Sequence, residues 1–279
     1  MNGSVKKILF GIVWLWLFWM AFWLSLDGDR WARLIESQGP ALGGTLTVSG
    51  LETQAFGIIA KSVEFQRYGR AYPVELETGP IQISIAPWNL LLGRIGFEAQ
   101  VYQGSLEGYL SVWGPEVVYQ VQGVSPNHHK GLRKMGLIQS NPRLDGKGRH
   151  DLLSGDGRSQ WSLAGLKLSG ETKNTGLIFE LPQVTLSQIV LEVELSGPEV
   201  KLAAKTLGDL AAQIDGKVGL NRVNPMASRL DLKLTGTLEP SFESRLGMVA
   251  PLISGYRDPS GRLGLSISGP ARMPQVSKL

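Results

Sequence analysis

Apolar and polar residues alternate one by one in many short segments of this chain, and this pattern constrains the fold more than any other feature. In one segment Ile95, Phe97, Ala99 and Val101 are separated by single polar or small residues. A period of two sends successive side chains to opposite faces of an extended strand, with one face on apolar material and the other toward water. The pattern therefore predicts a mainly β chain. Alternating or strand-like segments are 81–85, 95–102, 106–112, 117–121, 161–168, 189–195, 199–204, 214–220, 230–234 and 263–267.

A short signature, an apolar residue followed by Ser or Thr and then Gly, recurs six times at the ends of such segments. Gly adopts positive φ without steric cost, and the hydroxyl can hydrogen-bond to the turning backbone. Six turn marks spread along the chain predict a meandering antiparallel sheet, not parallel strands joined by long helices. The signatures are Val48-Ser49-Gly50, Leu153-Ser154-Gly155, Leu168-Ser169-Gly170, Leu195-Ser196-Gly197, Leu234-Thr235-Gly236 and Ile267-Ser268-Gly269.

Few helices are predicted outside the N-terminus, and all are short. Residues 29–38 place Trp31, Leu34 and Ile35 on one side of a helix that ends before Gly39-Pro40. Residues 87–93 have Pro at the start and Gly after the end of one or two turns. In residues 241–254, apolar side chains recur at helical spacing, and Pro251 should kink that helix.

The N-terminus carries an uncharged run of 19 residues, Ile8 to Leu26. At 1.5 Å per residue a helix of this length spans the roughly 30 Å hydrocarbon core of a bilayer. The alternative is a cleaved signal peptide, but its apolar region is shorter, about 7–15 residues, and ends in small residues that the exit sequence FWLSLD lacks. We therefore expect residues 1–26 to form a cytoplasmic tail and transmembrane anchor. Lys6 and Lys7 favour the cytoplasmic side, so residues 27–279 would form a β-rich domain in the bacterial periplasm.

Charge and composition exclude several function classes. Beyond the anchor, 26 basic side chains face 24 acidic ones, and this balance does not predict nucleic-acid binding. The absence of cysteine excludes disulfides, thiolate metal sites and a cysteine nucleophile. One local excess of positive charge could meet an acidic partner or anionic lipid headgroups, or form a solvated connector. It comprises Lys130, Arg133, Lys134, Arg143, Lys147 and Arg149.

A polar stretch, residues 125–148, interrupts the alternation. Two interpretations are open: a boundary that subdivides the periplasmic domain, or one long connection with a short helix near 130–138.

Chemistry-bearing pairs are few, and none predicts an enzyme or a bound cofactor. His128 and His129 lie in a polar stretch without further ligands to complete a metal shell. His150 and Asp151 could act as a base and its orienting carboxylate, but no serine stands in the Gly-x-Ser-x-Gly motif of a hydrolase. We expect no catalytic, cofactor-binding or metal-binding residues.

The order of features resembles that of a known family. The segment I-x-I-x-I-x-P-x-x-L-L-L-G-R-I over 81–95 is followed by F-x-A-x-V-Y-Q-G-x-L-x-G over 97–108, and the chain closes with GLSISGPA over 264–271. With the anchor ahead of them, these segments are similar to type II secretion system protein N, in the form related to the larger AsmA-like family of envelope proteins. The resemblance implies a long curved antiparallel sheet with an apolar inner face, no catalytic residues, and attachment to the inner membrane.

Two functions follow from this resemblance, and both use the sheet. The first is a non-enzymatic, inner-membrane-anchored periplasmic component of the type II secretion apparatus that docks other secretion or envelope proteins, with Lys130, Arg133 and Lys134 as candidate partner contacts. The alternative is an AsmA-like protein that binds or transfers phospholipid. Its candidate groove-lining residues are Ile83, Ile85, Phe97, Val101, Leu110 and Val121.

Overall fold

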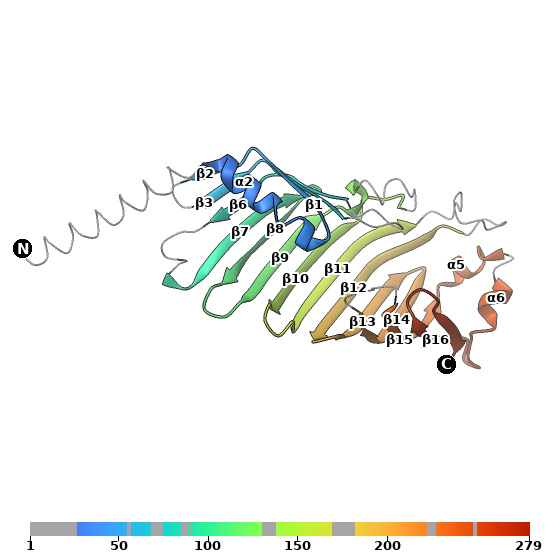
Figure 1. Ribbon diagram of the computed structural model, residues 1–279. Helices are drawn as coiled ribbons and strands as arrows, with labels where there is room; N and C mark the ends of the chain where they lie inside the picture. The colour runs from blue at the N-terminus through green and yellow to red at the C-terminus, as the bar shows by residue number, and fades with distance from the viewer. Residues whose placement is uncertain are drawn as a thin grey trace, which may run out of the picture. The chain divides into compact units, whose positions relative to one another are not determined.

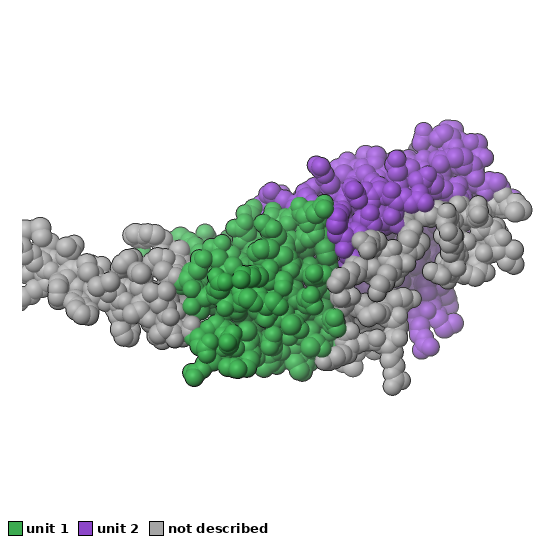
Figure 2. Space-filling model, turned by 90° about the horizontal axis from the view of Figure 1, so that it is seen from above, with its two compact units in different colours: residues 1–113 green, residues 114–279 purple. Residues whose placement is uncertain are grey.

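The computed structural model describes residues 27–54, 57–67, 75–84, 89, 91–129, 138–168, 182–221, 227–247 and 250–279 (Figure 1). The predicted transmembrane helix lies outside these ranges, as do residues 87, 88 and 90 of the predicted 87–93 helix. The described residues Asn89 and Leu91 of that segment are helical. Within them, no helix has the length and apolar character needed to cross a membrane. The chain divides into two compact units, residues 1–113 and 114–279, which Figure 2 colours separately.

Unit 1 contains five strands of the main antiparallel sheet, in the order β8-β7-β6-β3-β2. Alternation places Ile83 of β6 opposite Phe97 of β7, and Ile95 of β7 opposite Leu110 of β8, so these side chains share one face. The predicted strands at 81–85, 95–102 and 106–112 are confirmed within the described residues. The five strands are β2 (Glu52–Gln54), β3 (Gly57–Ala60), β6 (Ile81–Ser84), β7 (Arg94–Val101) and β8 (Gly104–Ser111).

A smaller sheet completes unit 1 in the order β1-β4-β5, with strands Gly44–Ser49, Ser62–Arg67 and Glu75–Thr78. Helix α2 (Gly28–Glu36) precedes it and confirms the predicted short helix; the 3₁₀ turn η1 (Pro40–Leu42) follows. The Asp27 carboxylate caps this helix by accepting a hydrogen bond from the Asp29 N–H, at 3.1 Å. At its other end Glu36 accepts from the Val48 N–H at 2.9 Å, which ties the helix to β1.

Unit 2 is an antiparallel meander in which each strand from β9 to β17 pairs with the next strand of the chain (Figure 1). The strands predicted from alternation are confirmed here as well. The helical segments are η2 (Pro126–His128), α5 (Pro240–Glu243) and α6 (Ala250–Ser254). The strands are β9 (Glu116–Val124), β10 (Arg143–Asp151), β11 (Gly157–Leu168), β12 (Val184–Ser196), β13 (Glu199–Gly208), β14 (Leu210–Gly219), β15 (Arg229–Leu238), β16 (Leu263–Pro270) and β17 (Gln275–Lys278).

The polar stretch 125–148 is not a connection along its whole length, as one interpretation predicted, because strand β10 begins within it. Residues 143–148 belong to this strand, which pairs with β9 and β11. The sequence hides it because Gly146 and Gly148 occupy positions where the alternation needs apolar side chains. The predicted helix near 130–138 falls almost entirely on residues outside the described part of the chain.

The predicted helix 241–254 is two short helices, α5 and α6, and not one kinked helix. The break comes before Pro251, which instead lies in the first turn of α6, where the missing N–H costs nothing. Phe242 and Leu246 are buried, as their place on the predicted apolar side implies.

The turn signature holds at three of the five positions that the structure describes. Gly50, Gly155 and Gly197 follow β1, β10 and β12 with φ of 60°, 75° and 56°. The prediction is wrong at Gly236 and Gly269, which lie inside β15 and β16. At Gly236 a Cβ would lie 2.7 Å from the Ala211 carbonyl oxygen, so this glycine permits close strand approach instead of a turn.

Candidate functional site

Unit 2 has one apolar face, formed by every second residue of its strands. Leu202 of β13 lies opposite Gly216 of β14, which in turn lies opposite Leu232 of β15. These positions are half-buried, so the apolar face remains partly open to solvent in the middle of these strands. A partly buried apolar surface of this kind can be covered further by a ligand or a partner.

Most of the buried apolar side chains of this face lie toward one end of the sheet. Leu166, Leu186, Ala212 and Leu263 are each 7–8% exposed and lie near the ends of β11, β12, β14 and β16. Phe242 and Leu246, in and just after α5, are 6% and 5% exposed. The end of the sheet at which β15 leads into α5 is therefore the best-packed part of unit 2.

An ion pair anchors the α5 segment to this end of the sheet. Asp209, whose side chain is 8% exposed, accepts a hydrogen bond from Arg245 Nη2 at 2.9 Å. Its other carboxylate oxygen accepts from the Thr185 N–H at 2.6 Å. Arg245 also donates to the Gln183 carbonyl at 3.3 Å, and its guanidinium lies over the Phe242 ring. The two hydrogen bonds from Arg245 link the segment after β15 to the residues before β12 and to the β13–β14 turn, and the Asp209–Thr185 bond links that turn to β12.

Three rings fill the space above three glycines on the strands β9 to β11. Tyr119 lies opposite Gly148, Trp161 opposite Gly146, and His150 opposite Gly157. A Cβ added to Gly146, Gly148 or Gly157 would lie 2.0–2.5 Å from an atom of the paired ring. Because glycine leaves the backbone bare, the neighbouring ring can lie flat across it and cover its apolar surface.

Hydrogen bonds fix the polar ends of these rings. Tyr119 Oη lies 3.1 Å from His150 Nε2, and Trp161 Nε1 donates to Ser159 Oγ at 3.1 Å. The Tyr119 and His150 rings stack with centroids 5.6 Å apart. Burial raises the pKa of the Tyr119 hydroxyl, which a hydrogen bond with Ser159 partly offsets. The hydroxyl therefore stays protonated at neutral pH and joins the ring cluster as a neutral group.

The opposite, polar face of unit 2 carries ion pairs between neighbouring strands. Arg158 donates to Glu194 at 2.8 Å, and Lys201 lies 3.6 Å from the same carboxylate. These two cations hold the pKa of Glu194 below its usual range, the Arg158 hydrogen bond being the larger cause. Arg149 pairs with Glu116 on β9 and β10, and Lys217 with Glu199 on β13 and β14.

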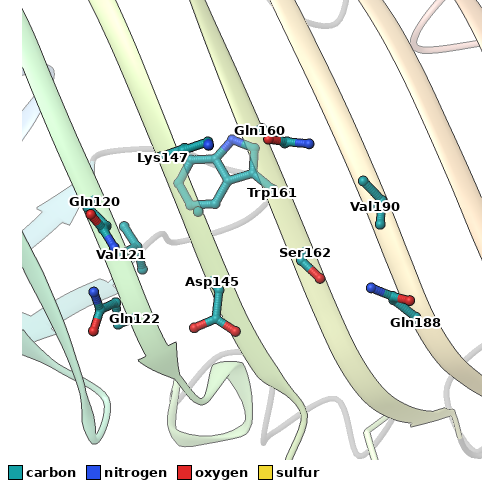
Figure 3. A pocket seen from close by; sticks show the side chains of 11 residues that line it. Gln120, Val121, Gln122, Asp145, Lys147, Gln160, Trp161, Ser162, Gln188 and Val190 are labelled. Carbon is teal, nitrogen blue, oxygen red and sulfur yellow. The ribbon is translucent and has the colours of Figure 1, made fainter.

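A hollow of about 490 Å³ lies on the polar side of β9 to β12 (Figure 3). Gln122, Asp145, Ser162 and Val190 come from four successive strands. Gln120, Lys147 and Gln160 form the next row, because Lys147 registers with both glutamines. The complete lining is Gln120, Val121, Gln122, Asp145, Gly146, Lys147, Gln160, Trp161, Ser162, Gln188 and Val190.

The candidate groove residues are brought together only in part. Ile83, Phe97, Val101 and Leu110 lie in unit 1 on β6, β7 and β8, half-buried and on one face of the sheet. Val121 lies on β9 in unit 2, opposite Gly146. The remaining predicted positions, Ile85, Lys130, Arg133 and Lys134, lie outside the described residues.

The histidine pairs form no catalytic or metal-binding arrangement among the described residues. His150 and Asp151 are neighbours on β10 and project to opposite faces. Asp151 instead accepts hydrogen bonds from the N–H groups of Leu153 and Ser154, which lower its pKa and close the β10–β11 turn. In the part of the chain that the structure describes, no three His, Asp or Glu side chains could together hold a metal ion.

Sequence analysis did not identify the hollow, the ring–glycine pairs or the Asp209–Arg245 ion pair. One available signal was the phase of the alternation, which shifts by one residue between Val121 and Val124, between Leu163 and Leu166, and between Leu186 and Ile189. Comparison with known proteins adds no name to these sites, since no family model, curated protein or solved structure matches the chain.

Proposed function

We propose that this protein is a non-enzymatic, inner-membrane-anchored component of the type II secretion apparatus, whose periplasmic sheet acts in assembly or docking. The proposal combines the resemblance of the segments at 81–108 and 264–271 with the N-terminal apolar run. The structural observation that supports it best is the antiparallel meander of unit 2, which offers two chemically distinct faces to other molecules.

A docking function accounts for several properties of these faces. Half-buried leucines such as Leu202 and Leu232 would gain stability from a partner that removes them from water, at roughly 25 cal/mol per Å² buried. The polar face would add charge complementarity through Arg158, Lys201 and Lys217. Neither property requires a reacting group.

The test of the secretion proposal is deletion of the gene, followed by comparison of the proteins that the cells release. We expect secreted substrates to accumulate in the periplasm and return to the medium when the full-length chain is restored. An unchanged set of released proteins would refute the secretion proposal. A protease added to spheroplasts should also degrade the chain beyond residue 26; complete protection would refute the proposed topology.

A second candidate function, phospholipid binding or transfer, is favoured by one specific observation: the apolar face of unit 2 is only partly buried in the middle of the sheet. An acyl chain lying along this face would cover it as a partner protein would. Native mass spectrometry of the full-length protein distinguishes the two proposals. Phospholipid that stays bound to the wild type should be lost when Leu202 and Leu232 are both replaced by Gln.

Matched controls for this measurement are Lys205→Gln and Lys233→Gln, on the polar positions of β13 and β15. They should retain the lipid, because they leave the apolar face intact. Protein that is always free of phospholipid would refute lipid binding and leave the secretion proposal standing on its own test.

A further inference from the structure

The hollow on the polar face exists because small side chains come together on neighbouring strands. Ser162 and Val190 lie directly opposite each other on β11 and β12, and both are half-buried. The side chains around them, Gln120, Lys147 and Gln160 in one row and Gln122 and Gln188 at the sides, are longer and exposed. We describe Ser162 and Val190 as the floor of the hollow and the longer polar side chains as its rim; Figure 3 shows the strand from which each comes.

Backbone irregularities lie beside the hollow. Gly123 on β9 has φ of 64° where the pairing with β10 shifts register, and Gly165 on β11 has φ of 72°. On β12 the pairing with β13 shifts at Ser187. Asp145, a residue of the hollow, holds the first of these bulges by accepting from the Gly123 N–H at 2.8 Å. Bulges bend strands and redirect side chains, and they are frequent next to binding sites.

The side chains of the hollow differ chemically from those on the rest of the polar face. Beyond the hollow, oppositely charged side chains pair across strands, as Arg158 does with Glu194. Within it, four of the side chains are glutamines, and the single cation Lys147 is balanced by the single anion Asp145. Among the described residues, Gln120, Gln122 and Gln188 make no side-chain hydrogen bond, and Gln160 makes one of 3.5 Å to Glu192.

We propose that this hollow binds an uncharged, hydroxyl-rich saccharide. Each glutamine amide offers one acceptor and two donors, which match hydroxyl groups that both donate and accept. An anionic ligand would need more positive charge than Lys147 supplies beside Asp145. An apolar ligand would strip water from the amides without replacing their hydrogen bonds, at a cost of about 1–3 kcal/mol for each unsatisfied group.

A polypeptide fits the hollow less well than a saccharide. Peptide side chains are usually held in apolar pockets. Of the apolar residues that line this hollow, only Val190 lies at a polar-face position, because alternation places Val121 and Trp161 on the other face of the sheet. The saccharide could come from a glycan of N-acetylated amino sugars or from a plain glucan. These two sources share their hydroxyl chemistry and differ in the acetamido group, so two probes separate them.

The experiment is saturation-transfer NMR on the full-length protein in a detergent without a sugar headgroup. The probes are chitotetraose, which carries acetamido groups, and cellotetraose, which does not. We expect saturable binding in the millimolar range by at least one of them. Replacing Gln120 and Gln160 together with Ala should weaken it about tenfold, because each amide loses a neutral hydrogen bond worth about 0.5–1.5 kcal/mol.

Two further variants make the result specific. Ser162→Tyr fills the floor of the hollow and should abolish binding, whereas Gln213→Ala should change the dissociation constant by less than twofold. Gln213 is the matched control because it is an exposed glutamine on β14, outside the hollow.

Three outcomes would overturn the proposal. The first is no saturable binding of either tetrasaccharide, and the second is equal weakening by Gln213→Ala and by the double variant. The third is binding of an extended Gly-Ser-rich peptide that Ser162→Tyr blocks while neither saccharide binds, which would assign the hollow to polypeptide. The inference does not rest on the proposed secretion function, since it concerns only the residues of the hollow.

Discussion

The Asp209–Arg245 ion pair should control how firmly the α5 segment is held on the sheet. Asp209→Ala removes the acceptor for Arg245 and leaves the Thr185 N–H, now bonded at 2.6 Å, without its partner. The half-exposed Arg245 can regain water, so its lost bond should cost only about 1 kcal/mol, whereas leaving the partly buried Thr185 N–H unpaired should cost about 1–3 kcal/mol. We expect local stability to fall by about 2–4 kcal/mol in total.

Hydrogen exchange measured by mass spectrometry on the full-length protein tests this estimate. Peptides covering 240–246 and the start of β12 should exchange roughly 30- to 800-fold faster in Asp209→Ala, since 1.4 kcal/mol corresponds to a factor of ten. Asp209→Asn should show a smaller effect, because its amide oxygen can still accept from Thr185. Arg158→Ala, which breaks an ion pair whose arginine is 81% exposed, is the matched control and should change exchange at α5 by less than twofold.

The reasoning would be refuted if Asp209→Ala left exchange at 240–246 unchanged. It would also be refuted if the Asp209→Ala and Arg245→Ala effects added fully in the double variant. Side chains that bond to each other should show coupling, so the double variant should lose less than the sum of the two single losses.

Three further predictions concern single positions. Gly146→Val should lower the free energy of unfolding in urea by about 1–3 kcal/mol, because its Cβ would lie 2.2 Å from the Trp161 ring, whereas Gly219→Ala, with its nearest neighbour at 3.9 Å, should be nearly neutral. Gly123→Ala should cost about 1–2 kcal/mol in the same assay through its positive φ, and Gly123→Asn less, since asparagine tolerates this conformation better; equal costs would contradict the strain argument. NMR titration should find the pKa of Asp151 below that of an unfolded aspartate, because the Ser154 and Leu153 N–H groups bond to its carboxylate. The contribution of Asp151 to stability is therefore present above the unfolded pKa and is lost as pH falls through the folded pKa. A normal or raised pKa would contradict these hydrogen bonds.

Alternation predicted most of the strands of this chain because each strand has one apolar and one polar face. It failed at β10, where Gly146 and Gly148 replace the apolar residues and the rings of Trp161 and Tyr119 arrive from other strands. A property that is supplied by a neighbouring strand cannot be read from the strand's own sequence. The same holds for Gly236, whose signature indicates a turn although close packing against Ala212 keeps it in β15.

The hollow could not be predicted from the sequence, because it depends on the register in which neighbouring strands pair. Ser162 and Val190 are 28 positions apart and become neighbours only when β11 and β12 pair as they do. A shift of one residue in this pairing would place the two side chains on opposite faces of the sheet. The phase shifts at Gly123 and Gly165 were visible in the sequence, but only the paired strands show that these bulges lie beside one site.

The strict pairing of each strand from β9 to β17 with its neighbours in the chain has a consequence for how unit 2 folds and unfolds. Every strand contacts mainly the one before it and the one after it, so the sheet can zip up hairpin by hairpin and can fray from its outer strand inward. Removing one whole hairpin would leave the direction and facing of all other strands unchanged. A sheet of this kind can therefore gain or lose one hairpin, which is two strands, without a change in the remaining pairings.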